Sequence, residues 1–490
     1  MNTKVVRIRE EEKTREALEK NPGLLEAAEI LRNGGLVAFP TETVYGLGAN
    51  ALNEEAAKKI YAAKGRPSDN PLIAHISCME ELPAIVKEIP EAGRKLAEKY
   101  WPGPLTMIFP KKDIVPYGTT GGLDTVAVRM PSDPVANCLI HLAGVPVAAP
   151  SANTSGRPSP TKAEHVIEDM DGKIEMVIDG GAVGIGVEST IVDVSSEVPT
   201  LLRPGAITIE MLRETLGQVD IDPVILGPVS GDIKPKAPGM KYRHYAPKAP
   251  VTVVTGPAEA SARTILQMVK PGDGVICFDE FAELFKEQEV ECLGPSQDKR
   301  IQAQRVFDAL RAFDSKDAAQ IYAQCPDSQG LGLAISNRLK KAAGAVFSSR
   351  LAHTAEQGER LYSSSEGKVQ DEYSRALLRA SIDKRDEKAI TDAMDKVNAS
   401  IDAKTKADEE RKAQEEAAAA AAAQAQSTPA PQQYSYTPSG SASGSGSGPT
   451  GGGYHSSGGS AGSTGGSASP GWSVPANPDP SQLPGTDPSL

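Results

Sequence analysis

The chain has 490 residues, of which 39% are hydrophobic and 4% aromatic, and its formal net charge is −12. After residue 345 there are 13 Lys and Arg against 18 Asp and Glu, which leaves −7 on residues 1–345. This length predicts two or three domains, and the acidic balance argues against a general binder of nucleic acid or anionic lipid. The N-terminal stretch is charged and contains no apolar run, and no window of 18 residues is apolar throughout. We therefore expect a cytoplasmic protein without membrane spans.

From about residue 20 to residue 216, short β-rich runs alternate with helical patterns. The expected strands are Leu36–Pro40, Leu72–Ile76, Leu105–Phe109, Thr125–Arg129, Val145–Ala149, Met176–Ile178, Thr190–Val194 and Thr200–Leu202. The expected helices are Leu24–Arg32, Glu54–Lys64, Glu91–Tyr100, Pro134–Leu142 and Thr161–Met170. Strands alternating with helices in this way predict one twisted α/β domain with a mixed sheet.

Residues 217–250 are rich in Pro and Gly and predict a linker, although a mere spacer would not need its Tyr242, His244 and Tyr245. A second, smaller α/β domain with a Rossmann-like pattern is expected over residues 251–344. Its predicted strands and helices are Val251–Val254, Gly274–Phe278 and Ile321–Ala323, and Ala258–Val269, Ile301–Phe313 and Leu333–Ala343.

Beyond residue 344 the pattern weakens in two steps. Residues 345–426 are polar and helical in propensity, and their sparse apolar positions favour a single or frayed helix over a coiled coil. Residues 427–490 are rich in Gly, Ser and Pro and predict a disordered tail. We expect truncation after Gly344 to leave the melting temperature and the activity unchanged.

The five cysteines predict neither disulfides nor a metal centre. They are widely spaced, form no CxxC pair and are not accompanied by clustered histidines; they are Cys78, Cys138, Cys277, Cys292 and Cys325. Their odd number and their spacing favour reduced thiols over a disulfide framework or a zinc site.

Two polar segments of the first half follow a predicted strand or helix. Residues 40–48 (PTETVYGLG) place hydroxyl and carboxylate groups after a buried strand, where ligands usually bind in open α/β sheets. Taken alone, an ordinary polar turn explains them better. Lys64 and Arg66 straddle a glycine at a helix end, so they could neutralise a triphosphate or merely cap a solvated helix. Two prolines around Asn70 are harder to explain as a cap.

Two further segments lie in the second half of the same domain. Residues 150–161 (PSANTSGRPSPT) carry six hydroxyl or amide side chains within eleven residues, which suits a polar ligand, a helix N-cap at Ser159 or Thr161, or both. The glycines of residues 180–186 precede a strand instead of opening a helix, so a dinucleotide fingerprint fails in this context. No Walker A, GxSxG or HExxH motif occurs in the sequence.

Together these segments resemble the threonylcarbamoyl-AMP synthase (YrdC-like) family. PTETVYGLG, KGRP with NPL and His75, VRMP, PSANTSGRPSPT, GVESTIVD and LRPG occur in the order and spacing of that family. KYRHYAP (241–247) and GLGLAISNR (330–338) are similar to its two-domain branch. The resemblance covers residues 20–344, and the remaining tail resembles no family.

The resemblance implies that the first domain binds ATP and L-threonine together. The residues it places on the phosphates, as the catalytic set, are Lys64, Arg66, Ser151 and Asn153. The other nucleotide contacts it implies are Asn70, Thr125, Ser159, Arg203 and, from a linker that closes as a lid, Tyr242 or Tyr245. The threonine contacts it implies are Thr41 or Thr43, His75, Ala149, Ser189 and Arg129, the last of which would bind the carboxylate.

The reaction implied by the resemblance joins threonine, bicarbonate or CO2, and ATP into threonylcarbamoyl-AMP and pyrophosphate. Mg²⁺ would be held mainly by the ATP phosphates. A partner transferase would then modify the tRNA adenosine beside the anticodon, so this chain would need no strong contact with nucleic acid. Two other functions remain open. One is a non-catalytic RNA-binding or translation-associated protein on the same fold, and the other is a carbamoyltransferase that uses carbamoyl phosphate without threonine.

Overall fold

The computed structural model describes residues 2–226, 236–238, 244–384 and 386–426. Most of the predicted linker core, with Tyr242, and the predicted tail lie outside these residues. Both α/β domains belong to one compact unit, Met1–Glu416. Within the described ranges, none of the helices is both long enough and apolar enough to cross a membrane.

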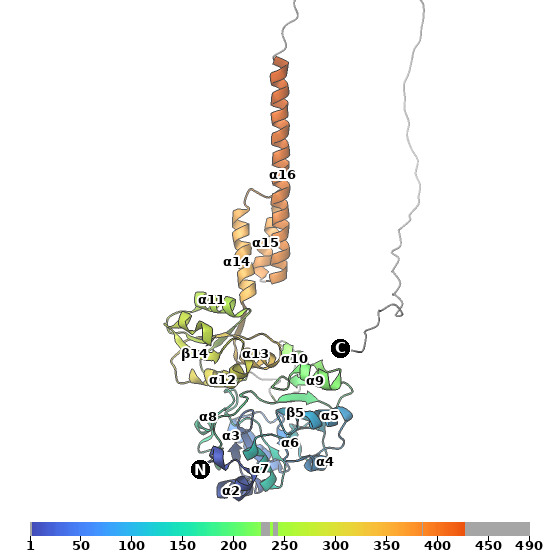
Figure 1. Cartoon of the computed structure of the whole chain (residues 1–490), viewed down its shortest axis with the longest axis vertical. Helices are drawn as coiled ribbons and strands as arrows, with labels where there is room; N and C mark the ends of the chain where they lie inside the picture. The colour runs from blue at the N-terminus through green and yellow to red at the C-terminus, as the bar shows by residue number, and fades with distance from the viewer. Residues whose placement is uncertain (1, 227–235, 239–243, 385, 427–490) are drawn as a thin grey trace, which may run out of the picture. The chain divides into compact units, whose positions relative to one another are not determined.

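The first domain is built on an eleven-stranded mixed sheet (Figure 1) with the order β1-β8-β2-β3-β7-β4-β6-β5-β9-β10-β11. Its strands are β1 (Lys4–Arg7), β2 (Val37–Phe39), β3 (Gly46–Asn50), β4 (Ile73–His75), β5 (Leu105–Pro110), β6 (Thr125–Arg129), β7 (Val147–Ala148), β8 (Met176–Asp179), β9 (Thr190–Asp193), β10 (Thr200–Arg203) and β11 (Asp220–Ile221). Its helices are α1 (Arg15–Lys20), α2 (Pro22–Arg32), α3 (Glu54–Lys64), α4 (Leu82–Ile85), α5 (Glu91–Tyr100), α6 (Tyr117–Thr120), α7 (Pro134–Ala143), α8 (Ala163–Met170), α9 (Ile209–Leu216) and α10 (Pro223–Leu226).

The predicted α/β class is confirmed, and each of the eight expected strands and five expected helices of this domain is present. Three strands were not predicted: β1, β3 and β11. Strand β3 is the informative case, because it contains the two glycines of PTETVYGLG, a segment for which an ordinary polar turn was the favoured interpretation. A Cβ atom on Gly48 would lie 2.7 Å from the Phe39 ring of β2 and 3.1 Å from the Val37 carbonyl oxygen. Glycine is therefore needed here so that two antiparallel strands can pack closely.

Helix α3 shows how local sequence places two of the predicted site residues. Asn53 caps its start by accepting hydrogen bonds from the amides of Glu55 and Ala56. Gly65 ends it with φ at 61°, a left-handed conformation that glycine adopts without strain. Lys64 is thus the last helical residue, and Arg66 begins the following loop.

The second domain is a five-stranded sheet with the order β14-β13-β15-β12-β16, and its strand pairs are parallel. Its strands are β12 (Val251–Thr255), β13 (Gly274–Phe278), β14 (Glu289–Gly294), β15 (Ile321–Gln324) and β16 (Ala345–Ser348). Its helices are α11 (Ala258–Met268), α12 (Lys299–Ala312) and α13 (Leu331–Ala342). The predicted elements are present, whereas β14 and β16 were not predicted.

The end of the second domain differs from our expectation. Residues 345–348 form strand β16, which pairs with β12, so the sheet continues past the closing helix that we predicted. Three helices follow, α14 (Ser349–Ser364), α15 (Glu372–Lys384) and α16 (Glu387–Gln426), and they pack around Leu378, Ile390 and Val397 (Figure 1). A single or frayed helix was therefore the wrong interpretation. The domain boundary at residue 344 stays a prediction.

Truncation after Gly344 is now expected to destabilise the protein. It removes the partner of β12 and the half-buried Phe347, which packs against the core that contains Val254. We expect the melting temperature to fall by at least about 3 °C relative to a chain ending after Ser348, which retains β16. Removing only residues 427–490 should leave the melting temperature of the full chain unchanged. Thermal unfolding of the chains that end after Gly344, Ser348 and Gln426 measures these differences. Equal melting temperatures for the first two chains would show that β16 adds no stability.

The two domains share a hydrophobic core. Val44 and Val187 of the first domain are buried in the same cluster as Phe307 and Leu310 of α12. The backbones also approach closely, because a Cβ atom on Gly186 would lie 2.3 Å from the Ala303 carbonyl oxygen. The second domain therefore packs directly on the segment that leads into β9.

Candidate active site

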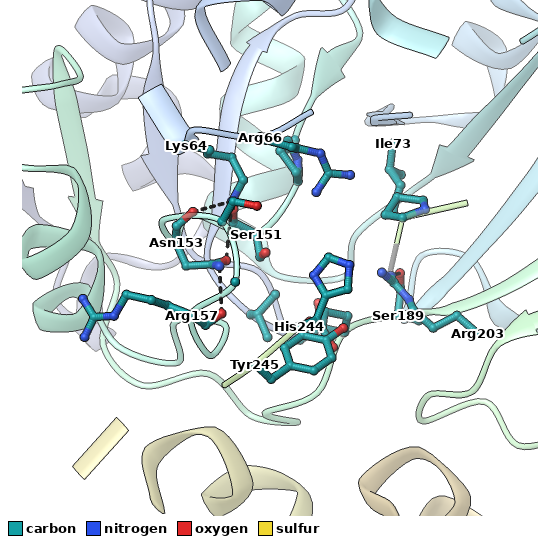
Figure 2. Close-up of a pocket in the computed structure, with 18 of the residues that line it drawn as sticks. Lys64, Arg66, Ile73, Ser151, Asn153, Arg157, Ser189, Arg203, His244 and Tyr245 are labelled. Atoms are coloured by element: carbon teal, nitrogen blue, oxygen red, sulfur yellow. Dashed lines mark hydrogen bonds between the residues drawn. The ribbon is translucent and has the colours of Figure 1, made fainter. Parts of the chain in front are cut away.

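A cavity that is partly open to solvent lies in the first domain beside the end of the linker (Figure 2). Most residues of the predicted site line it. They are Thr43, Lys64, Arg66, His75, Arg129, Ala149, Ser151, Asn153, Ser189, Arg203 and Tyr245. Their chemistry is polar and cationic, and they come from strands, helix ends and loops that are far apart in sequence. Whether each residue contacts a ligand stays a prediction.

Lys64 is fully buried, and its ammonium group holds the loop that begins at Ser151. The Nζ atom donates hydrogen bonds to the carbonyl oxygens of Ser151 and Asn153, both at 2.5 Å (Figure 2). Burial and the nearby positive charge of Arg66 place the pKa of Lys64 well below its usual value. In this arrangement Lys64 acts chiefly by fixing the loop.

Four predicted residues are not among those that line the cavity. The hydroxyl of Thr41 donates to the Val44 carbonyl oxygen at 2.7 Å, which shapes the turn and leaves Thr43 as the threonine of the pair that faces the cavity. Ser159 donates to Glu188 at 2.6 Å. Asn70 is buried, and its Oδ1 atom has no hydrogen-bond partner among the described residues. Thr125 begins β6, and it is not fully buried.

Arg129 is the buried cation at the predicted amino-acid end of the cavity. Its Nη1 atom donates to the Thr43 hydroxyl at 2.9 Å, its Nε atom donates to the Gly103 carbonyl oxygen at 3.3 Å, and its Nη2 atom lies 2.7 Å from a carboxylate oxygen of Glu42. Burial alone would raise the pKa of Glu42, but the charge of Arg129 outweighs it and lowers this pKa. The guanidinium is therefore held in one orientation by three groups.

His75 is held as a neutral ring. Its Nδ1 atom lies 3.1 Å from the Ile73 carbonyl oxygen and 3.2 Å from that of Val147, so we assign the proton to Nδ1. Burial and then the charge of Arg129 lower the pKa of His75 to about 3. The Nε2 atom of this tautomer is an acceptor, suited to an ammonium or hydroxyl group of a ligand.

Replacing His75 by Asn is expected to weaken the loss of stability in acid. The unfolded chain has a histidine pKa of about 6.5 and binds the proton that the folded protein excludes, so wild-type stability falls as the pH drops from about 6.5 towards 3. One proton contributes a slope of about 1.4 kcal/mol per pH unit.

Chemical denaturation of wild type and His75→Asn at about pH 7 and about pH 4.5 measures this difference. The exposed His141 on α7 gives the control variant His141→Asn. Equal pH slopes for wild type and His75→Asn would contradict the neutral assignment.

Glu188 is a buried acid that lines the cavity beside Ser189. Burial would raise the pKa of Glu188, but the charges of Arg338 and Arg203 and the hydrogen bond from Ser159 lower it to about 2. Arg203 donates to the carbonyl oxygen and to the hydroxyl of Ser189, at 3.0 and 3.1 Å. Glu188 therefore stays ionised within a cavity of mostly positive charge.

The end of the linker, at His244 and Tyr245, covers part of the cavity. Tyr245 is buried with its ring centroid 5.0 Å from that of Phe307 in α12, and its backbone has φ at 67°. His244 also lines the cavity (Figure 2), and burial and the charge of Arg66 lower its pKa to about 3. Of the two predicted linker tyrosines, Tyr245 lies at the site and Tyr242 is outside the described residues.

Several lining residues were not predicted: Val44, Ile73, Pro150, Ser155, Gly156, Arg157, Glu188, Pro238 and His244. Glu188 could have been found from sequence, because a carboxylate stands just before a buried strand in GVESTIVD. The sequence also singles out His244 without assigning it to the site, whereas the apolar residues Val44, Ile73, Pro150 and Pro238 carry no such signal.

Comparisons with known proteins agree with this geometry. Residues 29–205 match the family model described as "Telomere recombination", and residues 207–344 match "Threonylcarbamoyl-AMP synthase, C-terminal domain". The threonylcarbamoyl-AMP synthase of Pyrococcus abyssi is 51% identical over 322 residues, which cover 65% of this chain and 93% of that protein. A shorter putative threonylcarbamoyl-AMP synthase of Mycobacterium tuberculosis is 33% identical over 41% of this chain and 91% of its own length.

A solved structure is also similar to this one. The crystal structure of P. abyssi Sua5 complexed with L-threonine is 46% identical in sequence, with a TM-score of 0.64 over 71% of this chain and 99% of that chain. That chain is matched over nearly its whole length. The chain described here belongs to the threonylcarbamoyl-AMP synthase family.

Proposed function

We propose that this protein makes L-threonylcarbamoyl-adenylate from ATP, L-threonine and bicarbonate or CO2, with release of pyrophosphate. The observation that carries the proposal is that one cavity joins two kinds of group. Arg66, Arg203 and the loop held by Lys64 suit a polyphosphate, whereas Arg129, Thr43 and neutral His75 suit a small amino acid.

The chemistry needs no side-chain nucleophile. The amine of threonine adds to CO2 and loses a proton, which gives a carbamate anion. A carbamate oxygen then attacks the α-phosphorus of ATP, and the bond to pyrophosphate breaks. Catalysis consists of holding two anions in line and balancing the charge of the leaving group, which buried arginines and a rigid loop can do.

The contacts support a proposed role for each group in the cavity. Arg129 would bind the carboxylate of threonine, and the Nε2 atom of His75 would accept a hydrogen bond from its ammonium or hydroxyl group. Ser151 and Asn153 would meet the phosphates from the loop whose backbone Lys64 fixes. Tyr245, supported by Phe307, would cover the nucleotide as part of a lid.

Mg²⁺ belongs to the proposal as an ion carried by ATP. Glu188 is the carboxylate among the lining residues, and its two oxygens accept hydrogen bonds from Ser159 and Arg338. The donor set of the chain therefore fits an ion that takes its ligands from phosphate oxygens and water. When bound, the ion would offset the negative charge of the phosphates.

The wider setting is also proposed. The adenylate would pass to a partner transferase that modifies the tRNA adenosine beside the anticodon, in the cytoplasm. The negative charge of residues 1–345 supports a chain that does not itself bind tRNA strongly.

The direct test measures pyrophosphate release by the full chain with ATP, with L-threonine and bicarbonate each present or omitted. We expect release only when both are present. Turnover of carbamoyl phosphate without threonine would point to a carbamoyltransferase. Salt-sensitive tRNA binding without pyrophosphate release would point to an RNA-binding protein.

A further inference from the structure

An arginine of the second domain is buried against the first. Arg338 is on α13 and has no exposed surface. Its Nε atom donates to a carboxylate oxygen of Glu188 at 2.9 Å, and its Nη1 atom donates to the Pro204 carbonyl oxygen at 2.5 Å. Glu188 shortly precedes β9 and Pro204 follows β10, so both lie at the end of this antiparallel pair that carries Ser189 and Arg203. The side chain of Arg338 therefore lies behind the wall of a cavity lined mainly by residues 43–203.

The acid that Arg338 contacts presents a problem for the site. Glu188 lines the cavity proposed to take a triphosphate, and a buried carboxylate there repels phosphate oxygens. One of its oxygens accepts from Ser159, which carries no charge, and the other accepts from Arg338. Arg338 thus supplies the positive charge in direct contact with Glu188, whereas the guanidinium of Arg203 donates to the neighbouring Ser189.

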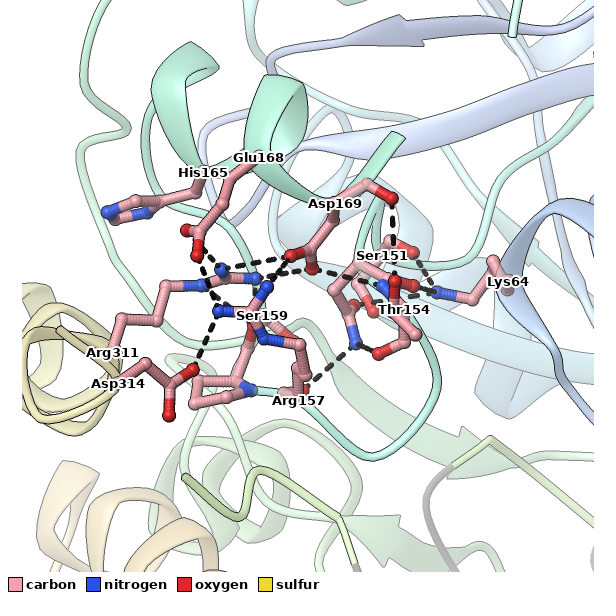
Figure 3. Close-up of polar contacts among 12 residues, drawn as sticks. Lys64, Ser151, Thr154, Arg157, Ser159, His165, Glu168, Asp169, Arg311 and Asp314 are labelled. Atoms are coloured by element: carbon pink, nitrogen blue, oxygen red, sulfur yellow. Dashed lines mark hydrogen bonds and ion pairs between the residues drawn. The ribbon is translucent and has the colours of Figure 1, made fainter. Parts of the chain in front are cut away.

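A second arginine of the same domain contacts the loop of residues 151–159, which carries the proposed phosphate contacts (Figure 3). Arg311 of α12 is buried and donates to the Pro158 carbonyl oxygen at 2.6 Å and to Asp169 at 2.8 Å. Asp169 in turn accepts from the backbone amide of Thr154 at 3.0 Å and pairs with Arg157. The loop of residues 151–159 is therefore fixed by Lys64 from one domain and by Arg311, through Asp169, from the other.

We propose that Arg338 is a positioning residue for ATP, which neutralises Glu188 so that the cationic side chains of the cavity stay available to the phosphates. Arg311 contributes rigidity to the loop, whereas Arg338 contributes charge. The second domain then contributes directly to ATP binding at the site. This inference rests on the proposed binding of ATP and goes beyond it by assigning a role to a residue outside the first domain.

The test uses the full chain and the variants Arg338→Met, Glu188→Gln and the double variant Arg338→Met/Glu188→Gln. ATP and L-threonine binding are measured separately by calorimetry. In Arg338→Met the unpaired carboxylate should weaken ATP binding at least about tenfold, while threonine binding changes by less than about threefold. In the double variant the charge is gone, so ATP binding should return to within about threefold of wild type.

Arg311→Met is the matched comparison, because it removes another buried arginine from the same interface. Adding Glu188→Gln to Arg311→Met should not restore ATP binding, since Arg311 does not contact Glu188. Arg305→Met, at a more exposed position on α12, should leave both affinities unchanged. If Arg338→Met is poorly folded, the comparison moves to Arg338→Lys, which retains a charge and should bind ATP nearly as wild type does.

Two results would overturn the inference. One is wild-type ATP affinity in Arg338→Met, and the other is an equal loss of ATP and threonine binding that Glu188→Gln does not relieve. Failure of the wild-type chain to bind ATP would instead overturn the proposed function, so the two failures are distinguishable.

Discussion

Replacing Lys64 by Ala is expected to reduce threonine-dependent pyrophosphate release by about a hundredfold to a thousandfold. The change removes the donor from two buried carbonyl oxygens, those of Ser151 and Asn153, and frees the loop that carries the predicted phosphate contacts. Losing one preorganised contact between this loop and the reacting groups would cost about 2.7–4 kcal/mol of transition-state stabilisation. Steady-state kinetics at saturating ATP and threonine would measure the loss.

Lys58→Ala is the control for this variant, because Lys58 is on the same helix, is exposed and pairs with Glu55. It should leave turnover within about twofold of wild type. Lys64→Met keeps most of the volume but not the charge, so it should be nearly as inactive as Lys64→Ala. Near-normal turnover of either Lys64 variant would remove this residue from the catalytic set.

Replacing Arg129 by Lys is expected to raise the KM for threonine by about thirtyfold or more and to change the KM for ATP by less than about threefold. A lysine has one ammonium group, so it cannot keep the contacts to Thr43, Gly103 and Glu42 and still offer a bidentate grip to a carboxylate. Charge-assisted hydrogen bonds of this type are each worth about 1.5–3 kcal/mol. Initial rates with each substrate varied in turn separate the two constants.

Arg203→Lys is the reciprocal variant and should raise the KM for ATP more than that for threonine. Both changes conserve charge, so a general loss of positive potential cannot account for the effect of either variant. An equal effect of Arg129→Lys on ATP and threonine would place Arg129 outside the amino-acid end of the cavity.

The sequence predicted which residues meet in the cavity better than it predicted what they do. Lys64, Ser151 and Asn153 were expected together on the phosphates, and the structure does bring them together. The role of Lys64 could not be predicted, because it depends on two backbone carbonyl oxygens whose direction is set by the fold. In the same way, Thr41 and Thr43 have the same side chain, and only the turn between β2 and β3 decides which one faces the cavity.

Long-range contacts account for most of what was missed. The contact between Glu188 and Arg338 joins residues 150 positions apart, and nothing in the neighbourhood of either residue indicates the other. Strand β16 was missed for a related reason, because four residues at the start of a helical region become a strand only when β12 offers an open edge. Tertiary pairing outweighs local propensity in such short segments.

The buried pair of Glu188 and Arg338 also bears on how this family diverged. Arg338 supplies the counter-charge in direct contact with Glu188, and it is encoded in another domain. A relative without the second domain lacks that guanidinium, so we expect it to carry a neutral residue at position 188. Position 188 and the presence of the second domain should therefore vary together across the family. The residue at position 188 in the first domain of a relative would then indicate whether that protein also has the second domain.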